Sequence, residues 1–263
     1  MDIPNRSPAG DGIGMRLIGG PTAMIEYLGL RLLTDPAFDA PGPIASGNRT
    51  LVKTAGPAVP VEEIGAVDAV LLSHDHHADN LDRAGRALLA HVPLTLTTPV
   101  GAERLGGTAS GMPVWQHADL DAPGGRGVRV TAVPAQHGPD GTDHITGPVT
   151  GFVLTADDAP TVYVSGDNAS LDVVKQVADR FAPVDVAVLF AGAARTPLVD
   201  GYLTLTAEQA AEAARLLRAR TVVPVHAEGW QHFTEGPDDL RAAFARQGLD
   251  TLLVLAPGES ATL

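Results

Sequence analysis

The sequence contains no cysteine among its 263 residues. This absence excludes disulfide bonds and thiolate metal sites and is typical of a reducing compartment, so we predict a cytoplasmic location. Lysine is almost as scarce, with two residues, and the formal net charge is -13. Nucleic acids and anionic membrane surfaces are bound by clustered Lys and Arg, so the composition argues against both as partners.

Long apolar runs are also missing. No stretch approaches the ~20 apolar residues that span a bilayer, so no membrane insertion is expected. Residues 1–13 open with "MDIPNRSPAGDG", which lacks the basic flank and apolar stretch of a secretory signal; they are predicted to be a flexible N-terminus. The remainder, 14–263, is long enough to bury one sizeable core, so we expect a single domain acting on a small-molecule substrate. Assembly into a homo-oligomer is left open.

Hydrophobic patterning predicts two similar halves, each running from short strands between turns to alternating strands and helices. Strands are expected at 15–19, 22–28, 30–35, 68–73, 94–98, 128–133, 150–155, 161–166, 184–190, 221–226 and 251–256. Helices are expected at 81–91, 100–106, 171–181, 206–219 and 238–248, and residues 36–60 are expected to form a long loop. Thr206 and Gln209 have the spacing of a capping box. The order predicts an α/β fold, a four-layer αββα sandwich with helices outside two stacked sheets.

Histidines and aspartates gather just beyond the carboxyl ends of predicted strands, where α/β sheets usually assemble their sites. These residues are His74, His76, His77 and Asp79 after the strand at 68–73, His137 after 128–133, Asp167 after 161–166 and His226 after 221–226. Imidazoles and carboxylates without thiolates suit Zn²⁺, Mn²⁺ or Fe²⁺. The pattern predicts a site for one or two such ions, with Zn²⁺ preferred.

Each residue also has an ordinary structural interpretation. Asp79 or Asn80 could cap the following helix, His226 could be a hydrogen-bonded core histidine, Asp167 a turn aspartate and His137 a loop residue. The joint pattern, in which every cluster follows a strand, favours the metal site. The remaining histidines are assigned to surface or packing roles: His91, His117, His144 and His232.

The motifs resemble those of the metallo-β-lactamase superfamily of hydrolases over roughly residues 15 to 258, most closely its ascorbate-phosphate lactonase and N-acylphosphatidylethanolamine phospholipase D branch. "GGPTAMIEYLGLRLLTDPAF" is similar to the opening hairpin and Thr-Asp-Pro turn of that branch. "SHDHHADNLD" resembles its His-x-His-x-Asp-His motif. "PAQH", "SGDN" and "PVH" resemble its later histidine, bridging aspartate and final histidine. The resemblance implies the same αββα fold.

The first motif departs from the family by one apparent extra residue and by Asn80, which stands where a ligand histidine is expected. Aligned on the resemblance, the ligands are His74, His77 and His137 for the first metal, Asp79 and His226 for the second, and Asp167 between them. His76 is then a spare ligand or a supporting group. An asparagine is a poor ligand, so the second site is expected to be weaker, altered or empty.

The function expected is that of a metal-dependent hydrolase acting on a small ester, lactone, amide or phosphodiester. A bound divalent metal lowers the pKa of water from about 15.7 towards ~7, and Asp79 would orient this water or carry its proton. Asp35 either supports a ligand histidine or is a turn residue before Pro36. The alternative is a non-hydrolytic protein on the same fold, either a di-iron oxidoreductase or a degenerate binding module with an incomplete metal site.

Substrate identity is not encoded in any of these motifs. Three segments are expected to border the pocket, at 36–60, 138–149 and 192–205. Arg195, in the third segment, is either a contact for an anionic group or a solvated loop residue.

Overall fold

The computed structural model describes residues 12–47 and 49–263, and this part of the chain forms a seven-stranded sheet, a six-stranded sheet and a two-stranded hairpin. The first sheet has the order β15-β1-β2-β3-β6-β7-β8, with β1 (Gly14–Gly19), β2 (Thr22–Tyr27), β3 (Leu30–Thr34), β6 (Ala69–Leu71), β7 (Thr95–Thr97), β8 (Ala109–Gly111) and β15 (Ser260–Thr262). The second has the order β14-β13-β12-β11-β10-β9, with β9 (His117–Asp121), β10 (Gly127–Pro134), β11 (Thr150–Thr155), β12 (Val162–Val164), β13 (Val186–Phe190) and β14 (Thr221–Val225). The hairpin pairs β4 (Gly42–Ser46) with β5 (Arg49–Lys53).

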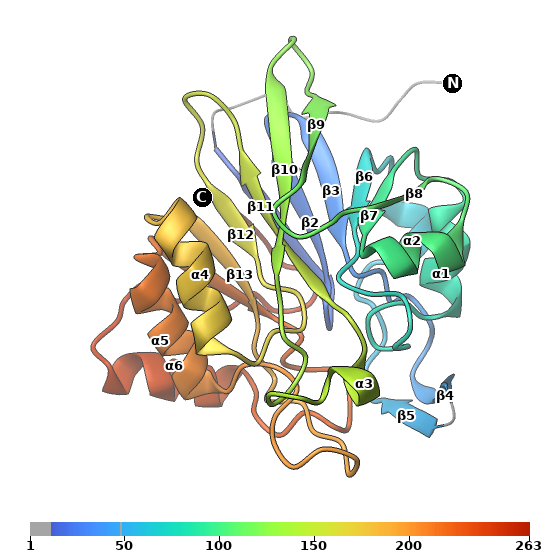
Figure 1. The fold of residues 1–263 in the computed structure, drawn as a ribbon, viewed down its shortest axis with the longest axis vertical. Helices are drawn as coiled ribbons and strands as arrows, with labels where there is room; N and C mark the ends of the chain where they lie inside the picture. Colours follow the sequence, from blue (N-terminus) through green and yellow to red (C-terminus); the bar gives the residue numbers. More distant parts are fainter. Residues whose placement is uncertain (1–11, 48) are drawn as a thin grey trace.

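Helices cover the outer faces of both sheets (Figure 1). They are α1 (Arg83–Leu89) and α2 (Pro99–Leu105) on one side and α4 (Leu171–Phe181), α5 (Ala207–Leu217) and α6 (Pro237–Arg246) on the other. The short α3 (Asp143–Thr146) lies at the lower edge in Figure 1, and there is a 3₁₀ turn at Val61–Glu63. The second sheet packs against α4, α5 and α6 through one apolar cluster, and the first sheet packs against α1 through another. No helix in the described ranges is long and apolar enough to cross a membrane.

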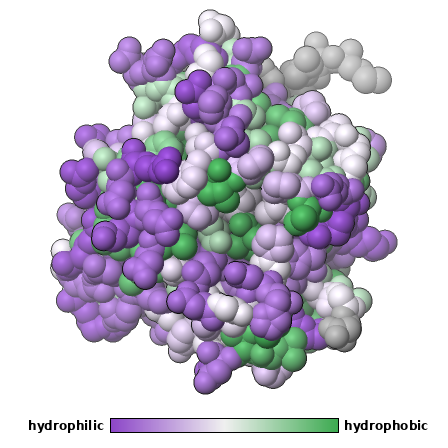
Figure 2. Space-filling model, in the orientation of Figure 1, coloured by the Kyte–Doolittle hydropathy of each residue, from purple (hydrophilic) through white to green (hydrophobic). Residues whose placement is uncertain are grey.

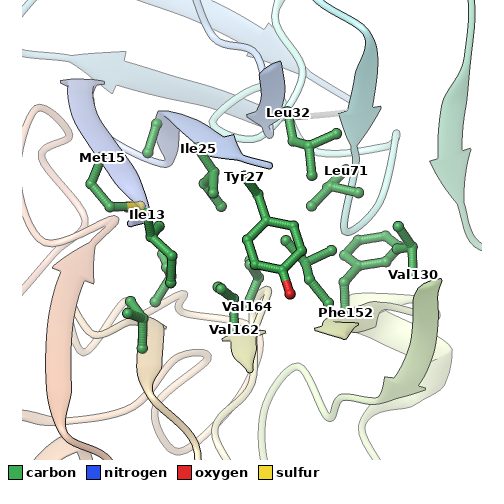
Figure 3. Close-up of a cluster of buried hydrophobic side chains, with 14 of the residues drawn as sticks. Ile13, Met15, Ile25, Tyr27, Leu32, Leu71, Val130, Phe152, Val162 and Val164 are labelled. Atoms are coloured by element: carbon green, nitrogen blue, oxygen red, sulfur yellow. The ribbon is translucent and has the colours of Figure 1, made fainter. Parts of the chain in front are cut away.

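The central core lies between the two sheets. Its buried side chains alternate along the strands, so each strand turns one apolar face towards the opposite sheet. Figure 3 shows Tyr27 and Leu32 of the first sheet facing Phe152 and Val130 of the second. Full burial of one such side chain contributes about 1.5–3 kcal/mol to stability. The four layers confirm the predicted αββα sandwich.

Most predicted elements are confirmed, because their hydrophobic pattern extends over enough residues or their capping residues are clear. α4 spans 171–181 as predicted, and α5 begins with the predicted capping box: Gln209 N donates to Thr206 Oγ1 at 3.2 Å and Thr206 N donates to Gln209 Oε1 at 3.0 Å. The isolated β-bridge between Val222 and Leu252 is all that corresponds to the strand predicted at 251–256. The last strand is β15 instead, which pairs with β1.

Two segments in the first quarter of the chain differ from the prediction. The segment 36–60 is not a continuous loop, because it contains the β4–β5 hairpin. Residues 1–11 of the predicted flexible N-terminus lie outside the described residues. Ile13 is 1% exposed, and its main chain pairs with Leu263 in both directions, at 3.1 and 2.9 Å. The packed part of the chain therefore begins by Ile13, one residue before the predicted start.

Candidate metal centre

The predicted ligand residues follow four strands, as expected. The segment beginning at His74 follows β6, His137 follows β10, Asp167 follows β12 and His226 follows β14. Contacts between side chains from all four segments bring these strand ends to one place. First-sheet and second-sheet residues therefore share one site.

His74, His77 and His137 form the first of two candidate metal-binding groups found among the described residues. His77 Nδ1 lies 2.9 Å from His74 Nε2 and 3.2 Å from His137 Nε2. His137 Nδ1 lies 2.9 Å from the carbonyl oxygen of Leu203, which can only accept a hydrogen bond. The proton of neutral His137 is therefore on Nδ1, and its Nε2 directs a lone pair at the other imidazoles. Converging nitrogen lone pairs are what a divalent transition metal binds.

Burial keeps the imidazoles of His74 and His77 uncharged at neutral pH. It lowers the pKa of His74 well below its usual value, and the neighbouring His77 adds to the effect. The pKa of His77 is lowered to about 3, mainly by burial and next by the neighbouring His137. Metal binding requires neutral imidazoles, so at neutral pH a cation has no proton to displace from His74 or His77.

A short chain of hydrogen bonds orients His74. Ser73 Oγ lies 2.8 Å from His74 Nδ1 and donates to Asp35 Oδ1 at 2.8 Å, and the Ser73 main-chain N–H donates to the same oxygen at 2.8 Å. Because the hydroxyl donates to Asp35, it accepts from Nδ1–H of His74, which leaves Nε2 free to bind a metal. Asp35 thus supports this histidine through Ser73. Its turn before Pro36 is real as well, with φ of +26°.

Asp79, His226 and His232 form the second group. Asp79 Oδ2 lies 2.9 Å from His232 Nε2 and 3.4 Å from His226 Nε2. Burial alone would raise the pKa of Asp79, but hydrogen bonds from His226 and His232 hold it well below its usual value. Burial would lower the pKa of His226, but the nearby Asp167 and Asp79 carboxylates raise it above its usual value. The second group therefore presents an ionised carboxylate to a cation.

Asp167 stands between the groups. One carboxylate oxygen, Oδ2, is 3.6 Å from His137 Nε2, and the other, Oδ1, is 3.5 Å from His226 Nδ1. Asn80 Nδ2 donates to Asp167 Oδ1 at 3.1 Å. Each oxygen faces a histidine of a different group, which is the arrangement a bridging ligand requires. Asn80 orients this carboxylate.

Buried nitrogens without partners support the assignment of a metal. Nδ1 of His226 and Nδ1 of His232 are both buried and have no hydrogen-bond partner among the described residues. An imidazole nitrogen that is buried and unpaired costs free energy unless something else binds it. The donor set of imidazoles and carboxylates fits Zn²⁺, Mn²⁺ or Fe²⁺.

Backbone conformation helps to aim the ligands. His226 has φ of +55°, in the left-handed region that residues other than glycine seldom adopt. Its N–H donates to the carbonyl of Gly20 at 2.7 Å, which holds this turn. Gly166, with φ of +58°, precedes Asp167, and a Cβ there would lie 2.5 Å from the carbonyl oxygen of Thr150. Only glycine therefore fits at 166.

The structure places His232, for which a surface or packing role was predicted, against Asp79 at the site. Its ring is half-buried and contacts Asp79 at the site. The segment around it is held on two sides: Gln231 N donates to the Val52 carbonyl at 3.0 Å, and Arg195 N donates to the His232 carbonyl at 3.0 Å. The signal in the sequence was its position six residues after His226 in the same loop. The other three histidines assigned to the surface, His91, His117 and His144, are exposed.

The structure also shows the surroundings of His76 and which residue caps the helix after the first motif, two points for which the sequence allowed alternatives. His76 lies outside both groups, and its Nε2 is 2.7 Å from the carbonyl oxygen of Thr146. Neither Asp79 nor Asn80 caps the next helix. α1 begins at Arg83, and its cap is Asp82, whose Oδ1 accepts from Gly85 N at 2.9 Å.

A cavity of about 830 Å³ lies beside the first group. Its size is that of small-molecule sites, which span about 300–1,000 Å³. Residues 39–47 line one side, and His76 and His77 line another, so part of the predicted border segment 36–60 does face it. The other two predicted border segments contact histidines of the site. Segment 138–149 does so through Thr146, which contacts His76, and segment 192–205 through Leu203, which contacts His137. Figure 2 shows mostly hydrophilic side chains over the face seen in Figure 1, with hydrophobic groups near the lower edge, in the region of α3.

Residues 30–227 match the family model of the beta-lactamase superfamily domain. A UPF0173 metal-dependent hydrolase of Anaeromyxobacter sp. (strain K) is 31% identical over 210 residues, covering 75% of this chain and 72% of its own. The crystal structure of an isothiocyanate hydrolase from Delia radicum gut bacteria aligns with a TM-score of 0.80 at 25% identity, over 94% of this chain and 98% of that chain. CmlA, a diiron β-hydroxylase from Streptomyces venezuelae, shares the fold with a TM-score of 0.66 at 17% identity, over 98% of this chain and 55% of that chain.

The fold, the site and these matches define the class: the chain belongs to the metallo-β-lactamase superfamily. Within it, the chain is a metal-dependent hydrolase related to the UPF0173 proteins.

Proposed function

We propose that the chain holds two divalent cations and hydrolyses a small ester, lactone, amide or phosphodiester. The observation that supports this proposal is the pair of ligand groups with Asp167 between them. His74, His77 and His137 would hold one cation, and Asp79, His226 and His232 the other. We infer Zn²⁺ as the cation, because four or fewer nitrogen and oxygen ligands at each position suit its tetrahedral preference.

His232 changes the expectation for the second position. Asn80 removes one imidazole from the motif, and His232 supplies another from a different segment. The second position then has one carboxylate and two imidazoles besides Asp167. It is therefore proposed to be complete, in contrast to the weakened site expected from the sequence.

The cations supply Lewis acidity and a water of lowered pKa when they are bound. Asp79 is buried and ionised, and it lies where it can accept a proton from that water or orient it. In the metal-free fold, Nε2 of His232 and Nε2 of His226 both lie against Oδ2 of Asp79, at 2.9 and 3.4 Å, so the other carboxylate oxygen is the one left for this task. The half-buried His77 lines the cavity, so a substrate in the cavity reaches the first group.

The branch of the superfamily is also a proposal. The opening strands β1 to β3 end in the Thr34-Asp35-Pro36 turn, and Asp35 supports His74 through Ser73. This use of the turn supports the lactonase and phospholipase D branch that the motif resembles. A small-molecule substrate is supported by the size of the cavity. A cytoplasmic location stays a prediction from composition.

The test is elemental analysis of the purified protein together with hydrolysis of a panel of chromogenic esters, lactones, amides and phosphodiesters. We expect about two transition-metal ions per chain and hydrolysis that chelation abolishes and Zn²⁺ or Mn²⁺ restores. His74→Ala should lose metal and activity, whereas the exposed His91→Ala should keep both. Less than one ion per chain after reloading, with no hydrolysis of any member of the panel, would contradict the proposal. A visible absorption band of iron would instead support the oxidoreductase alternative.

A further inference from the structure

The β4–β5 hairpin has two distinct faces. Burial alternates along both strands: the outward side chains, such as Ala45 and Thr50, are exposed, and the inward ones are half-buried or buried. Ser46 and Arg49 are directly opposite each other in the ladder. Opposite residues in an antiparallel pair point to the same face, so both point inward. Ser46 is buried and lines the cavity.

The inward face meets the metal centre at Ser46 and Arg49. Ser46 Oγ accepts a hydrogen bond at 3.1 Å from the N–H of Ala78, the residue between His77 and Asp79. Arg49 donates from Nη1 to Thr196 Oγ1, on the segment 192–205. The Arg49 guanidinium therefore lies between the hairpin and the segment that contacts His137. Its positive charge is also among the influences that lower the pKa of His77.

Three arginines around the site are paired with carboxylates, and the exposed Arg86 donates to the main-chain carbonyl of Asp75 at 2.8 Å. Among the described residues, the half-buried Arg49 has no carboxylate partner. Arg104 is paired with Asp75, Arg83 with Asp39 at 3.8 Å, and Arg195 with Asp200 at 3.9 Å. These three exposed or half-exposed side chains have their charge partly neutralised.

Within residues 12–47 and 49–263, no carboxylate lies within 4.0 Å of the Arg49 guanidinium nitrogens, although this side chain is half-buried. A cation that is partly desolvated and unpaired costs free energy, which an anion bound beside it offsets. The chain carries a net charge of -13, so this local positive charge is opposite in sign to the molecule as a whole.

We propose that Arg49 binds an anionic group of the substrate, a carboxylate or a phosphate, at the entrance to the metal centre. The proposal rests on the proposed function for the reaction, and it narrows the substrate class to anionic molecules. Arg49 would then determine the preference for anionic over neutral substrates. One of the five guanidinium N–H donors is used on Thr196, and the four others are enough for bidentate recognition of either group.

The experiment compares the metal-loaded wild type with Arg49→Gln, Arg49→Lys and Arg195→Gln. Inorganic phosphate and acetate serve as binding probes in calorimetric titrations. Hydrolysis is measured on two esters of matched size, neutral p-nitrophenyl butyrate and anionic mono-p-nitrophenyl succinate. Arg195→Gln is the matched control, because it removes the same charge from a neighbouring residue that already has a carboxylate partner.

We expect the wild type to bind at least one probe and to prefer the anionic ester. Arg49→Gln should weaken probe binding and raise KM for the anionic ester by about 10-fold or more, the usual effect of losing a charged hydrogen bond. KM for the neutral ester should stay within about twofold. Arg49→Lys should fall between the two, because lysine keeps the charge without the planar fork.

Three results would overturn the inference: equal binding by wild type and Arg49→Gln, no binding of either probe by the wild type, or a larger loss with Arg195→Gln. Circular dichroism melting shows whether Arg49→Gln is folded, and Arg49→Lys decides the question if it is not. Probe binding does not depend on catalysis. Absence of hydrolysis with intact, Arg49-dependent binding would therefore contradict the proposed function and leave the anion site standing.

Discussion

At the scale of single residues, His232 decides whether the proposed second metal position has two imidazoles or one. Its Nε2 contacts Asp79 directly, and its Nδ1 is buried without a partner among the described residues. Asn80 occupies the place where the motif would have a ligand histidine, and its side chain donates to Asp167 instead. The two residues therefore have complementary roles: one orients the bridging carboxylate, and the other completes the ligands.

His232→Ala should weaken metal binding at the second position by at least about tenfold, since even losing a residue that supports a ligand costs 10–100-fold. Metal content after dialysis should then fall from two ions per chain towards one. Elemental analysis across a series of free Zn²⁺ concentrations measures this. His117→Ala, which removes an exposed histidine, is the control. Unchanged metal content in His232→Ala would show that this histidine only packs.

The pH dependence of stability is set partly by His77. In the metal-free fold its pKa is about 3, below the ordinary value of 6.5 that applies in the unfolded chain. Between these values the unfolded chain binds a proton that the folded chain does not, so acid favours unfolding. From pH 7 to pH 5 this costs about 2 kcal/mol, since the full slope of about 1.4 kcal/mol per pH unit applies only below pH 6.5.

Urea unfolding of chelated wild type and His77→Gln, from pH 7 to pH 5, measures this contribution. The wild type should lose about 2 kcal/mol more than the variant over this range. The groups that both proteins share, including His226 with its raised pKa, cancel to a first approximation in the comparison. Parallel pH profiles would show that His77 takes up a proton normally in the metal-free fold.

At the scale of elements, the hairpin and α1 are joined by a buried ion pair. Lys53 Nζ lies 3.1 Å from Asp82 Oδ2, and both side chains are almost fully buried. Asp82 also caps α1 through Gly85 N and accepts from Asp39 N at 2.6 Å. One carboxylate thus fixes the start of a helix, the base of the hairpin and the chain leading into it.

Lys53→Met should destabilise the protein by about 3–5 kcal/mol, because it leaves the Asp82 carboxylate buried without its cation. Arg83→Ala removes an exposed partner of Asp39 at 3.8 Å and should cost less than about 0.5 kcal/mol. Guanidinium unfolding of the two variants gives both values. A Lys53→Met variant as stable as Arg83→Ala would mean that water replaces the ammonium group.

The β4–β5 hairpin is an element that the sequence did not predict. Proline and glycine in 36–47 indicated a loop, and the alternation at 49–53 is only one short strand long, so local pattern was ambiguous. The hairpin exists because its inward side chains find partners far away in sequence, such as Lys53 with Asp82. Long elements such as α4 and α5, whose own periodicity and caps determine them, were predicted to within a residue or two.

The same distinction applies to the site. The places of His74, His137 and His226 in the fold were predictable, because each closely follows a strong apolar strand. His232 was not, because its place depends on hydrogen bonds to Val52 and Arg195, which are remote in the chain. Arg49 gave no signal in sequence for a similar reason: its position depends on the hairpin.

At the scale of the whole molecule, the metal centre joins the two sheets. His74, His77 and Asp79 follow β6 of the first sheet, and His137, Asp167 and His226 follow strands of the second. Each proposed metal position therefore draws its ligands from both sheets. Ions that bind only the folded state stabilise it by mass action, by about 2.7 kcal/mol at a hundred times Kd.

Chelation should accordingly lower the melting temperature by roughly 5 °C or more for a chain of this size. Differential scanning fluorimetry with and without a chelator, followed by Zn²⁺ restoration, measures the shift. In His74→Ala the chelator should have a smaller effect. A melting temperature that chelation leaves unchanged would contradict metal binding in the folded state.

The distribution of ligands along the chain has a consequence for synthesis. The first position is complete in sequence at His137, or at Asp167 if the bridge is counted, whereas the second needs His232, close to the end of the chain. A chain emerging from the ribosome can thus assemble its first set of ligands before α5, β14 and α6 have been made. The second set forms only when almost the whole chain is present, so under the proposed two-metal site the second ion would bind after the first.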